Sequence, residues 1–147
     1  MSRKTDRKHI FCLLFQHCFN PFETEEIKSK LDYHLDNFSE DKISELDFVL
    51  GEVNGVLNNI NSLDNHIEKV SESWDLSRIS KIDLTIMRLA VYEIIHNSEI
   101  SAAVAINEAV ELAKEFSTED SSKFVNGILG KLSREIIQDK HAEDTAL

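Results

Sequence analysis

Apolar residues recur at helical spacing along most of the chain. In one segment, Ile27, Leu31 and Leu35 are four positions apart, which places them on one face of a helix. We predict an all-α protein with about seven helices. The first six lie near residues 6–19, 23–37, 43–60, 63–74, 78–95 and 102–116, and the last runs from 118 to 138.

Polar residues mark where some of these helices begin or break. Ser101 can cap the helix over 102–116, and Asp75 or Ser77 the preceding one, because their side-chain oxygens accept hydrogen bonds from first-turn amides. Asparagines around Asn59 interrupt the third apolar pattern. We expect a single domain over residues 1–138 and a polar, disordered tail over residues 139–147.

The composition supports a helical domain and narrows its setting. The 147 residues are 41% hydrophobic but include only one proline and four glycines, too few for the turns of a strand-rich fold. The two cysteines have no CxxC spacing, which favours a reducing, cytoplasmic location. The longest apolar run, residues 10–15, is far shorter than the roughly 20 residues of a membrane-spanning helix, so no membrane association is expected.

The formal net charge is −11, yet the chain begins with basic residues. Arg3, Lys4, Arg7 and Lys8 precede or enter the first helix, where each cation opposes the helix dipole by about 0.3–1 kcal/mol. Because an acidic surface repels polyanions, a nucleic-acid site has to be a local patch or be completed by a partner. This start is interpreted as a phosphate-contacting patch; the alternative is a solvated leader.

The last predicted helix has a second face beside its apolar one. Its core face is formed by Val125, Ile128, Leu129, Leu132 and Ile136. About 90–100° away, Asp120, Phe124, Gly127 and Lys131 follow the spacing i, i+4, i+7, i+11, and Lys123 lies beside them.

Two glycines in this helix lie off its core face. Gly127 and Gly130 each cost about 1 kcal/mol relative to alanine inside a helix. One interpretation is that a ligand approaches the backbone here, with Phe124 stacking on a base and the neighbouring lysines meeting phosphate. The alternative is that another helix of the same protein packs closely against the glycines and covers Phe124.

Other chemistry finds little support in the sequence. The six histidines have no metal-ligand spacing, and the chain lacks the GxGxxG, GxxxxGK[ST] and GxSxG motifs, so we expect no metal, no cofactor and no catalysis. Arg88 is a lone charge among apolar residues. We expect it to form an ion pair with a nearby acid such as Asp83 or Glu93.

Three segments resemble the NusB family of transcription antitermination factors. VAINEAVELAKEFSTEDSSKFVNGIL, residues 104–129, follows the family's carboxyl-terminal signature almost residue for residue. DLTIMRLAVYEI, residues 83–94, is similar to the preceding family helix, and SRKTDRKHIFCLLFQ, residues 2–16, to the family opening. The likeness covers most of the chain and is weaker over residues 20–75.

This resemblance implies a fold and a function. The fold is two small helical bundles within one compact domain. The function is binding without catalysis: with NusE, a small ribosomal-subunit protein, the factor binds boxA RNA. The complex joins NusA, NusG and RNA polymerase, suppresses premature termination and supports ribosomal RNA transcription. A homodimer of the free chain is left open.

The resemblance also assigns roles to individual residues. The implied RNA-binding residues are Arg3, Lys4, Arg7, Lys8, Lys123 and Phe124. Asp120, Gly127 and Lys131 lie at the edge of that surface, where Asp120 limits RNA affinity by repelling phosphate. Asp83 matches an acidic position that faces NusE.

Two departures from the family pattern point to weak RNA binding by the chain alone. The opening has fewer arginines than some relatives and carries Asp6 among its cations, and the overall charge is acidic. Both features indicate that the basic partner is needed. A protein-only helical adaptor, with no direct RNA contact, is the alternative function.

Overall fold

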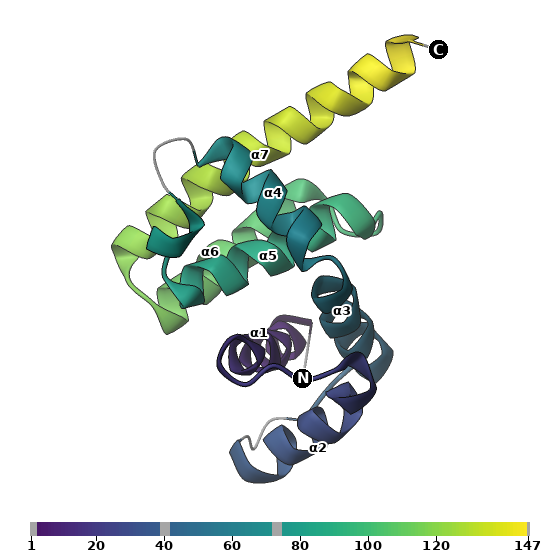
Figure 1. Ribbon diagram of the computed structural model, residues 1–147, viewed down its shortest axis with the longest axis vertical. Coiled ribbons are helices and arrows are strands. Elements are labelled where there is room, and N and C mark those ends of the chain that lie inside the picture. The colour runs from purple at the N-terminus through teal and green to yellow at the C-terminus, as the bar shows by residue number, and fades with distance from the viewer. Residues whose placement is uncertain (1–2, 39–41, 72–74, 147) are drawn as a thin grey trace. The chain divides into compact units, whose positions relative to one another are not determined.

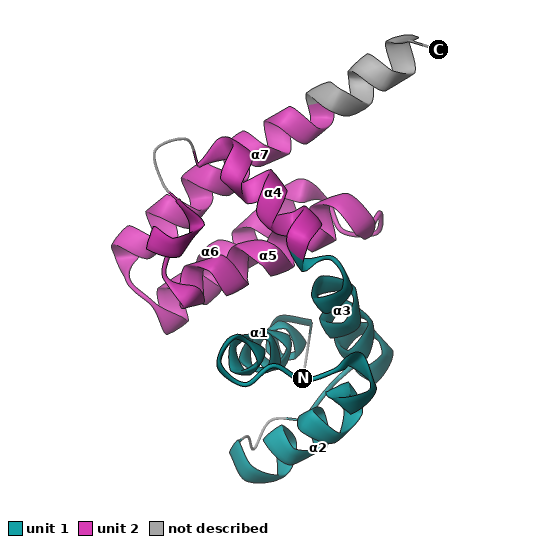
Figure 2. Cartoon of the chain, in the orientation of Figure 1, with its two compact units in different colours: residues 1–60 teal, residues 61–147 magenta. Residues whose placement is uncertain are grey.

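The prediction of an all-α chain is confirmed in the computed structural model, which describes residues 3–38, 42–71 and 75–146, with side chains to residue 137. Every regular element in the described ranges is a helix (Figure 1). The chain forms two compact units, residues 1–60 and residues 61–147 (Figure 2).

In its described residues the first unit contains three α-helices and one short 3-10 helix. These are α1 (Arg3–Phe19), η1 (Thr24–Glu26), α2 (Ile27–Phe38) and α3 (Leu46–Asn58). Helix α1 is buried along the apolar side that contains Phe11 and Leu14, and its Ile10 and Leu13 are fully inaccessible. They share the core with Leu31 of α2 and with Val49 and Val53 of α3. Since each helix alone would leave an apolar face in water, burial of these side chains holds the unit together.

A buried carboxylate of α1 caps the start of α3. Asp6 is 0% exposed, and its two oxygens accept hydrogen bonds from the backbone amides of Ser44 at 2.8 Å and Glu45 at 2.9 Å. These amides lie at the amino end of α3, which has no cap from its own neighbouring side chains. Asp6 therefore supplies the cap from a distant part of the sequence.

Two buried histidines join α1 to α2. Nδ1 of His9 lies 3.2 Å from Nε2 of His34, and the residues are 4% and 5% exposed. Burial, and secondarily the proximity of His9, lower the pKa of His34 below its usual 6.5. His34 is therefore held in its neutral form, and the short distance between the two nitrogens places an N–H of one ring against the lone pair of the other.

Four α-helices and a 3-10 helix make up the part of the second unit that the structure describes. They are α4 (Ile60–Val70), η2 (Leu76–Arg78), α5 (Lys81–His96), α6 (Ala102–Phe116) and α7 (Glu119–Ala146). Helix α6 packs against both α5 and α7. The core face predicted for α7 is correct at Val125, Leu129 and Leu132, all of which are buried.

The helix ends partly follow the sequence predictions. Ser101 caps α6 as expected, since its hydroxyl accepts from the backbone amide of Val104 at 3.2 Å. The cap of α5 is Ser80, which accepts from the Asp83 amide at 3.1 Å. Asp75 instead caps the intervening η2 by accepting from the Ser77 amide. Helix α7 runs past the expected end near residue 138, because the tail contains no glycine or proline to stop it.

Arg88 forms the expected ion pair, but the predicted partner was wrong. Its Nε and Nη2 donate to the two carboxylate oxygens of Asp64 in α4, at 2.7 and 2.8 Å. Both side chains are less than one-fifth exposed. This bidentate ion pair links α5 to α4. Asp64 lies too far from Arg88 in the sequence for helical spacing to identify it as the partner. Within the described residues, no helix is long and apolar enough to cross a membrane.

Candidate nucleic-acid interface

The four cations of the basic start have different surroundings in the first unit. Lys4 is exposed, and Lys8 is half-buried. Arg3 forms an ion pair with Glu45 at 3.2 Å, and its guanidinium carbon lies 4.3 Å from the centre of the Phe48 ring. Such an exposed pair is worth little in free energy, so Arg3 can exchange it for a phosphate.

Arg7 is the exception among these cations. It is only 5% exposed, and its guanidinium carbon lies 5.5 Å from the Phe48 ring centre. We assign Arg7 to packing of α1 on α3, because a phosphate cannot reach a buried guanidinium without moving α1. Asp6, the acid in the same stretch, is also buried, and its carboxylate caps the start of α3.

The structure decides between the two interpretations of the glycines in α7. A methyl group added at Gly127 would meet nothing within 4 Å, and one at Gly130 would meet only the Arg134 side chain at 3.5 Å. No neighbouring helix packs closely against either position, so the intramolecular alternative is wrong at Gly127 within the described part of the chain. The second face of α7 has an open stretch of backbone at its centre.

Phe124 lies in a groove between α7 and the start of α5. Its side chain is half-buried. The sequence interpretations were an aromatic ring exposed to a ligand or a ring covered by another helix, and the observed exposure lies between the two. The groove has a volume of about 340 Å³ and is lined by Arg78, Ile79, Ser80, Asp83, Asp120, Ser121 and Phe124. The ring therefore forms part of the wall of this groove and is only partly accessible.

Asp83 lies at the base of this groove rather than on an open surface. It is 6% exposed, and its Oδ2 accepts a hydrogen bond from the Ser121 hydroxyl at 3.1 Å. Ser121 in turn accepts from the Ser117 hydroxyl at 2.8 Å. This chain of hydrogen bonds fixes the start of α7 to α5. Asp83 therefore holds the two walls of the groove together.

Lys123 points away from Phe124 to the other flank of α7. It is exposed and lines a second groove of about 480 Å³ between α6 and α7. Asp120 is exposed beside the Phe124 groove, and Lys131 is half-buried further along the helix. The stripe predicted from the sequence thus has two distinct grooves beside it, one on each side of the helix.

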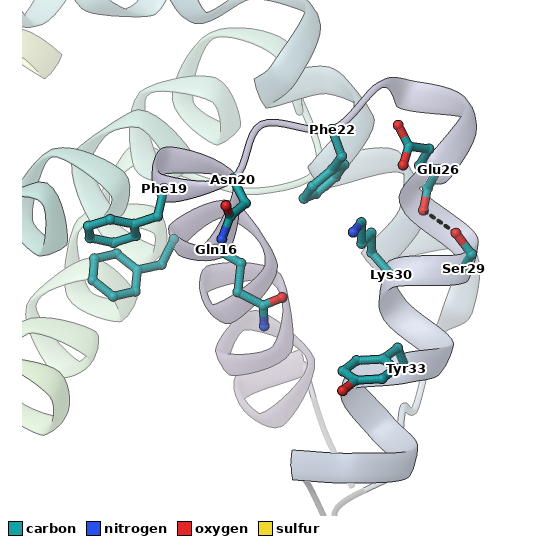
Figure 3. Close-up of a pocket in the computed structure, with 9 residues that line it drawn as sticks. Gln16, Phe19, Asn20, Phe22, Glu26, Ser29, Lys30 and Tyr33 are labelled. Atoms are coloured by element: carbon teal, nitrogen blue, oxygen red, sulfur yellow. Dashed lines mark hydrogen bonds between the residues drawn. The ribbon is translucent and has the colours of Figure 1, made fainter.

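An aromatic groove in the first unit was not predicted. It has a volume of about 590 Å³ and is lined by α1, the loop that follows it, and α2 (Figure 3). Phe19 and Tyr33 are 56% and 60% exposed, and the Lys30 ammonium lies 5.8 Å from the centre of the Phe22 ring. Glu26 also lines it, so its one cation and one acid give no clear preference for a charged ligand.

Side chains of the types that ligate metals occur in both units. Among the residues that the structure describes, no three histidine, cysteine or acidic side chains come together as metal ligands. Both cysteines are half-buried thiols that form no disulfide with each other. The candidate sites therefore offer stacking, hydrogen bonding and charge, which are the means of binding single-stranded nucleic acid.

Comparison with known proteins settles the relationship suggested by these features. The family model described as the NusB family matches residues 4–134. The chain belongs to the NusB family. The transcription antitermination protein NusB of Acetivibrio thermocellus is 43% identical over 134 residues, covering 90% of this chain and 88% of that protein. NusB of Natranaerobius thermophilus is 37% identical, covering 92% and 97%.

Solved structures agree with the NusB fold. NusB of T. maritima superimposes with a TM-score of 0.77 at 35% identity, covering 92% of each chain. A structure described as antitermination factors NusB and NusE in complex with double-stranded RNA gives a TM-score of 0.77 at 21% identity, over 90% of this chain and 96% of that one. At that identity the second match concerns the fold alone.

Sequence reasoning missed several residues of the grooves. Arg78 and Ser121 line the Phe124 groove, but neither lies on the stripe that drew attention to α7. Asn107 and Asn126 line the α6–α7 groove. The asparagines were the signal that could have identified the α6–α7 groove. Asparagine is a poor helix former, so its presence on the exposed face of a helix calls for an explanation other than helix stability.

Proposed function

We propose that this protein is a transcription antitermination factor that acts by binding. With a NusE-type ribosomal protein it holds boxA-type single-stranded RNA and helps RNA polymerase avoid premature termination, notably in ribosomal RNA operons. Membership of the NusB family supports this proposal, as do relatives whose name is transcription antitermination protein. Assembly with NusA, NusG and RNA polymerase in the cytoplasm belongs to the same proposal.

The observation that carries the RNA contact is the open face of α7. Gly127 has free space above its backbone, and it lies one helical turn from the half-buried Phe124 ring. A glycine in a helix interior costs stability, and no neighbouring element of the described chain explains it. A base that stacks on Phe124 would use the space at Gly127, with a contribution of about 1–3 kcal/mol.

Each unit contributes cations to this binding. We propose that Arg3, Lys4 and Lys8 of the first unit, together with Lys123 of the second, contact phosphate. Lys131 and Asp120 lie at the edge, where the Asp120 carboxylate repels phosphate and limits affinity.

The partner is proposed to be basic. The chain carries 27 acidic and 16 basic residues, so its surface attracts a cationic protein and repels RNA at long range. Asp83 contributes from the base of the Phe124 groove. A NusE-type partner would then supply the positive charge that this chain lacks.

The proposal is tested by recovering the protein from bacterial cells with its bound molecules. Tagged protein should retain a small ribosomal-subunit protein together with RNA enriched in boxA-type sequence. Phe124→Leu, which keeps most of the apolar volume but removes the aromatic face, should retain the protein partner and lose the RNA enrichment. Recovery of the protein partner without RNA from the unaltered chain would favour the protein-only adaptor.

A further inference from the structure

The two grooves beside α7 differ in charge. On the α5 side, Arg78 faces two acids, Asp83 and Asp120, which leaves one net negative charge. On the α6 side, two cations, Lys114 and Lys123, face one acid, Glu119, which leaves one net positive charge. A phosphate is therefore favoured on the α6 side and disfavoured beside Phe124.

Both cations of the α6–α7 groove are available. Lys123 is exposed on the first turns of α7. Lys114, near the end of α6, forms an ion pair with Glu111 at 3.9 Å, and both side chains are more than one-third exposed. Such a pair is worth less than about 1 kcal/mol in water, so a phosphate can replace it.

Two amides line the same groove further from the α6–α7 turn. Asn107 projects from α6 and Asn126 from α7, and both are exposed. Each amide offers a donor and an acceptor, the combination that matches the edge of a nucleobase. Asparagine is unfavourable inside a helix, and neither side chain is needed for the core, so the helices themselves do not account for this pair.

The spacing of these groups suits an extended ligand. Asn107 precedes Lys114 by two helical turns, about 10 Å along α6, whereas Asn126 lies one turn beyond Lys123. A free phosphate would contact only the lysine end. The groove volume, about 480 Å³, lies within the range of roughly 300–1,000 Å³ typical of ligand sites.

We propose that the groove between α6 and α7 is a nucleotide site, in which Lys114 and Lys123 hold phosphate while Asn107 and Asn126 read the edge of a base. The site rests on the proposed RNA-binding function and makes it more specific. The RNA backbone lies on the α6 side of α7, and a neighbouring base reaches the Phe124 face. Sequence preference then comes from the amides, since the lysines contact every RNA alike.

The lysines are tested by salt-dependent binding. Fluorescence anisotropy would follow a short labelled boxA-type RNA titrated with the full chain and its NusE-type partner. Lys114→Met and Lys123→Met should each weaken binding to all RNA sequences and make the slope of log affinity against log salt shallower by about 0.7. Lys69→Met, which removes an exposed lysine of α4, is the matched control and should leave the slope unchanged.

The amides are tested by sequence discrimination. Asn107→Ala and Asn126→Ala should weaken binding of the preferred RNA about 2- to 10-fold, the effect of one lost hydrogen bond. They should also reduce the distinction between bases at one RNA position, with the salt slope unchanged. Asn65→Ala, at an exposed asparagine of α4, is the control that should behave as wild type.

The outcomes separate this site from the function on which it rests. If the unaltered protein and its partner bind no RNA, the proposed function fails. If wild type binds and Phe124→Leu weakens binding, but all four groove variants match their controls, the nucleotide site is overturned together with the phosphate contact of Lys123, while RNA binding as the function stands. It is equally overturned if the lysine variants lose the protein partner but keep their RNA affinity, because the groove would then hold an acidic protein segment.

Discussion

Gly127→Ala separates what α7 needs for folding from what it needs for binding. The added methyl group would enter open space, with no atom of another side chain or helix within 4 Å. Alanine is favoured over glycine in a helix interior by about 1 kcal/mol, and a compatible site gains about 0.4–1 kcal/mol. We expect the free energy of unfolding to rise by that amount, with a melting temperature about 1–4 °C higher.

The same methyl group should weaken RNA binding. If a base approaches the backbone at Gly127, the added carbon occupies part of its space. The overpacking cost of about 1–3 kcal/mol corresponds to roughly 5- to 150-fold lower affinity. A variant that folds more stably yet binds more weakly would be difficult to explain by any general damage to the protein.

Two other glycines provide matched controls. Gly51 in α3 also has nothing within 4 Å of an added methyl group, and Gly130 in α7 has only an ordinary contact with Arg134. Alanine at either position should stabilise the protein and leave RNA affinity unchanged. Thermal unfolding and RNA anisotropy measured on all three variants give the comparison. The reasoning is refuted if Gly127→Ala destabilises the fold, or if it binds RNA as tightly as the two controls.

Three further predictions concern the scaffold. The pKa of His34 is lowered by burial and by His9, so below about pH 6.5 the unfolded chain binds more protons than the folded one, and the free energy of unfolding should fall as the pH drops below that value. Urea unfolding at pH 7 and pH 5 measures this dependence, which His34→Gln should flatten. Asp64→Asn should lower the free energy of unfolding by about 1–3 kcal/mol, since it removes the charged partner of the Arg88 guanidinium at a mostly buried position. A double-mutant cycle with Arg88→Met should reveal a coupling energy between the two residues. A coupling energy near zero would contradict the prediction. Asp6→Ala should cost about 1–2 kcal/mol by uncapping α3, a loss that denaturant titration would detect and that an intact stability would contradict.

The fold could be predicted from the sequence because its main signals are local. The spacing of Ile27, Leu31 and Leu35 identifies a helix without knowledge of what it packs against, and a serine before an apolar pattern identifies a start, as at Ser101. The failures involve contacts between distant residues. The Arg88 partner lies 24 positions away, and the acid that caps α3 comes from α1.

The candidate site shows the same division. Helical geometry identifies the stripe of Phe124 and Gly127, because one helix is enough to define it. It does not reveal that Lys123 and Phe124 line different grooves, since the two flanks of α7 are formed by other helices. Helical geometry also does not predict that Arg7 is buried while Lys4 is exposed, because that difference depends on how α1 packs against α3.

The most direct test of RNA binding as the function of this protein is its affinity for boxA-type RNA across a range of salt concentrations, measured with and without a NusE-type partner. Our account predicts weak binding by the acidic chain alone and much tighter binding by the pair, with log affinity falling linearly and steeply as log salt increases. RNA affinity of the pair equal to that of the partner alone at every salt concentration would contradict it.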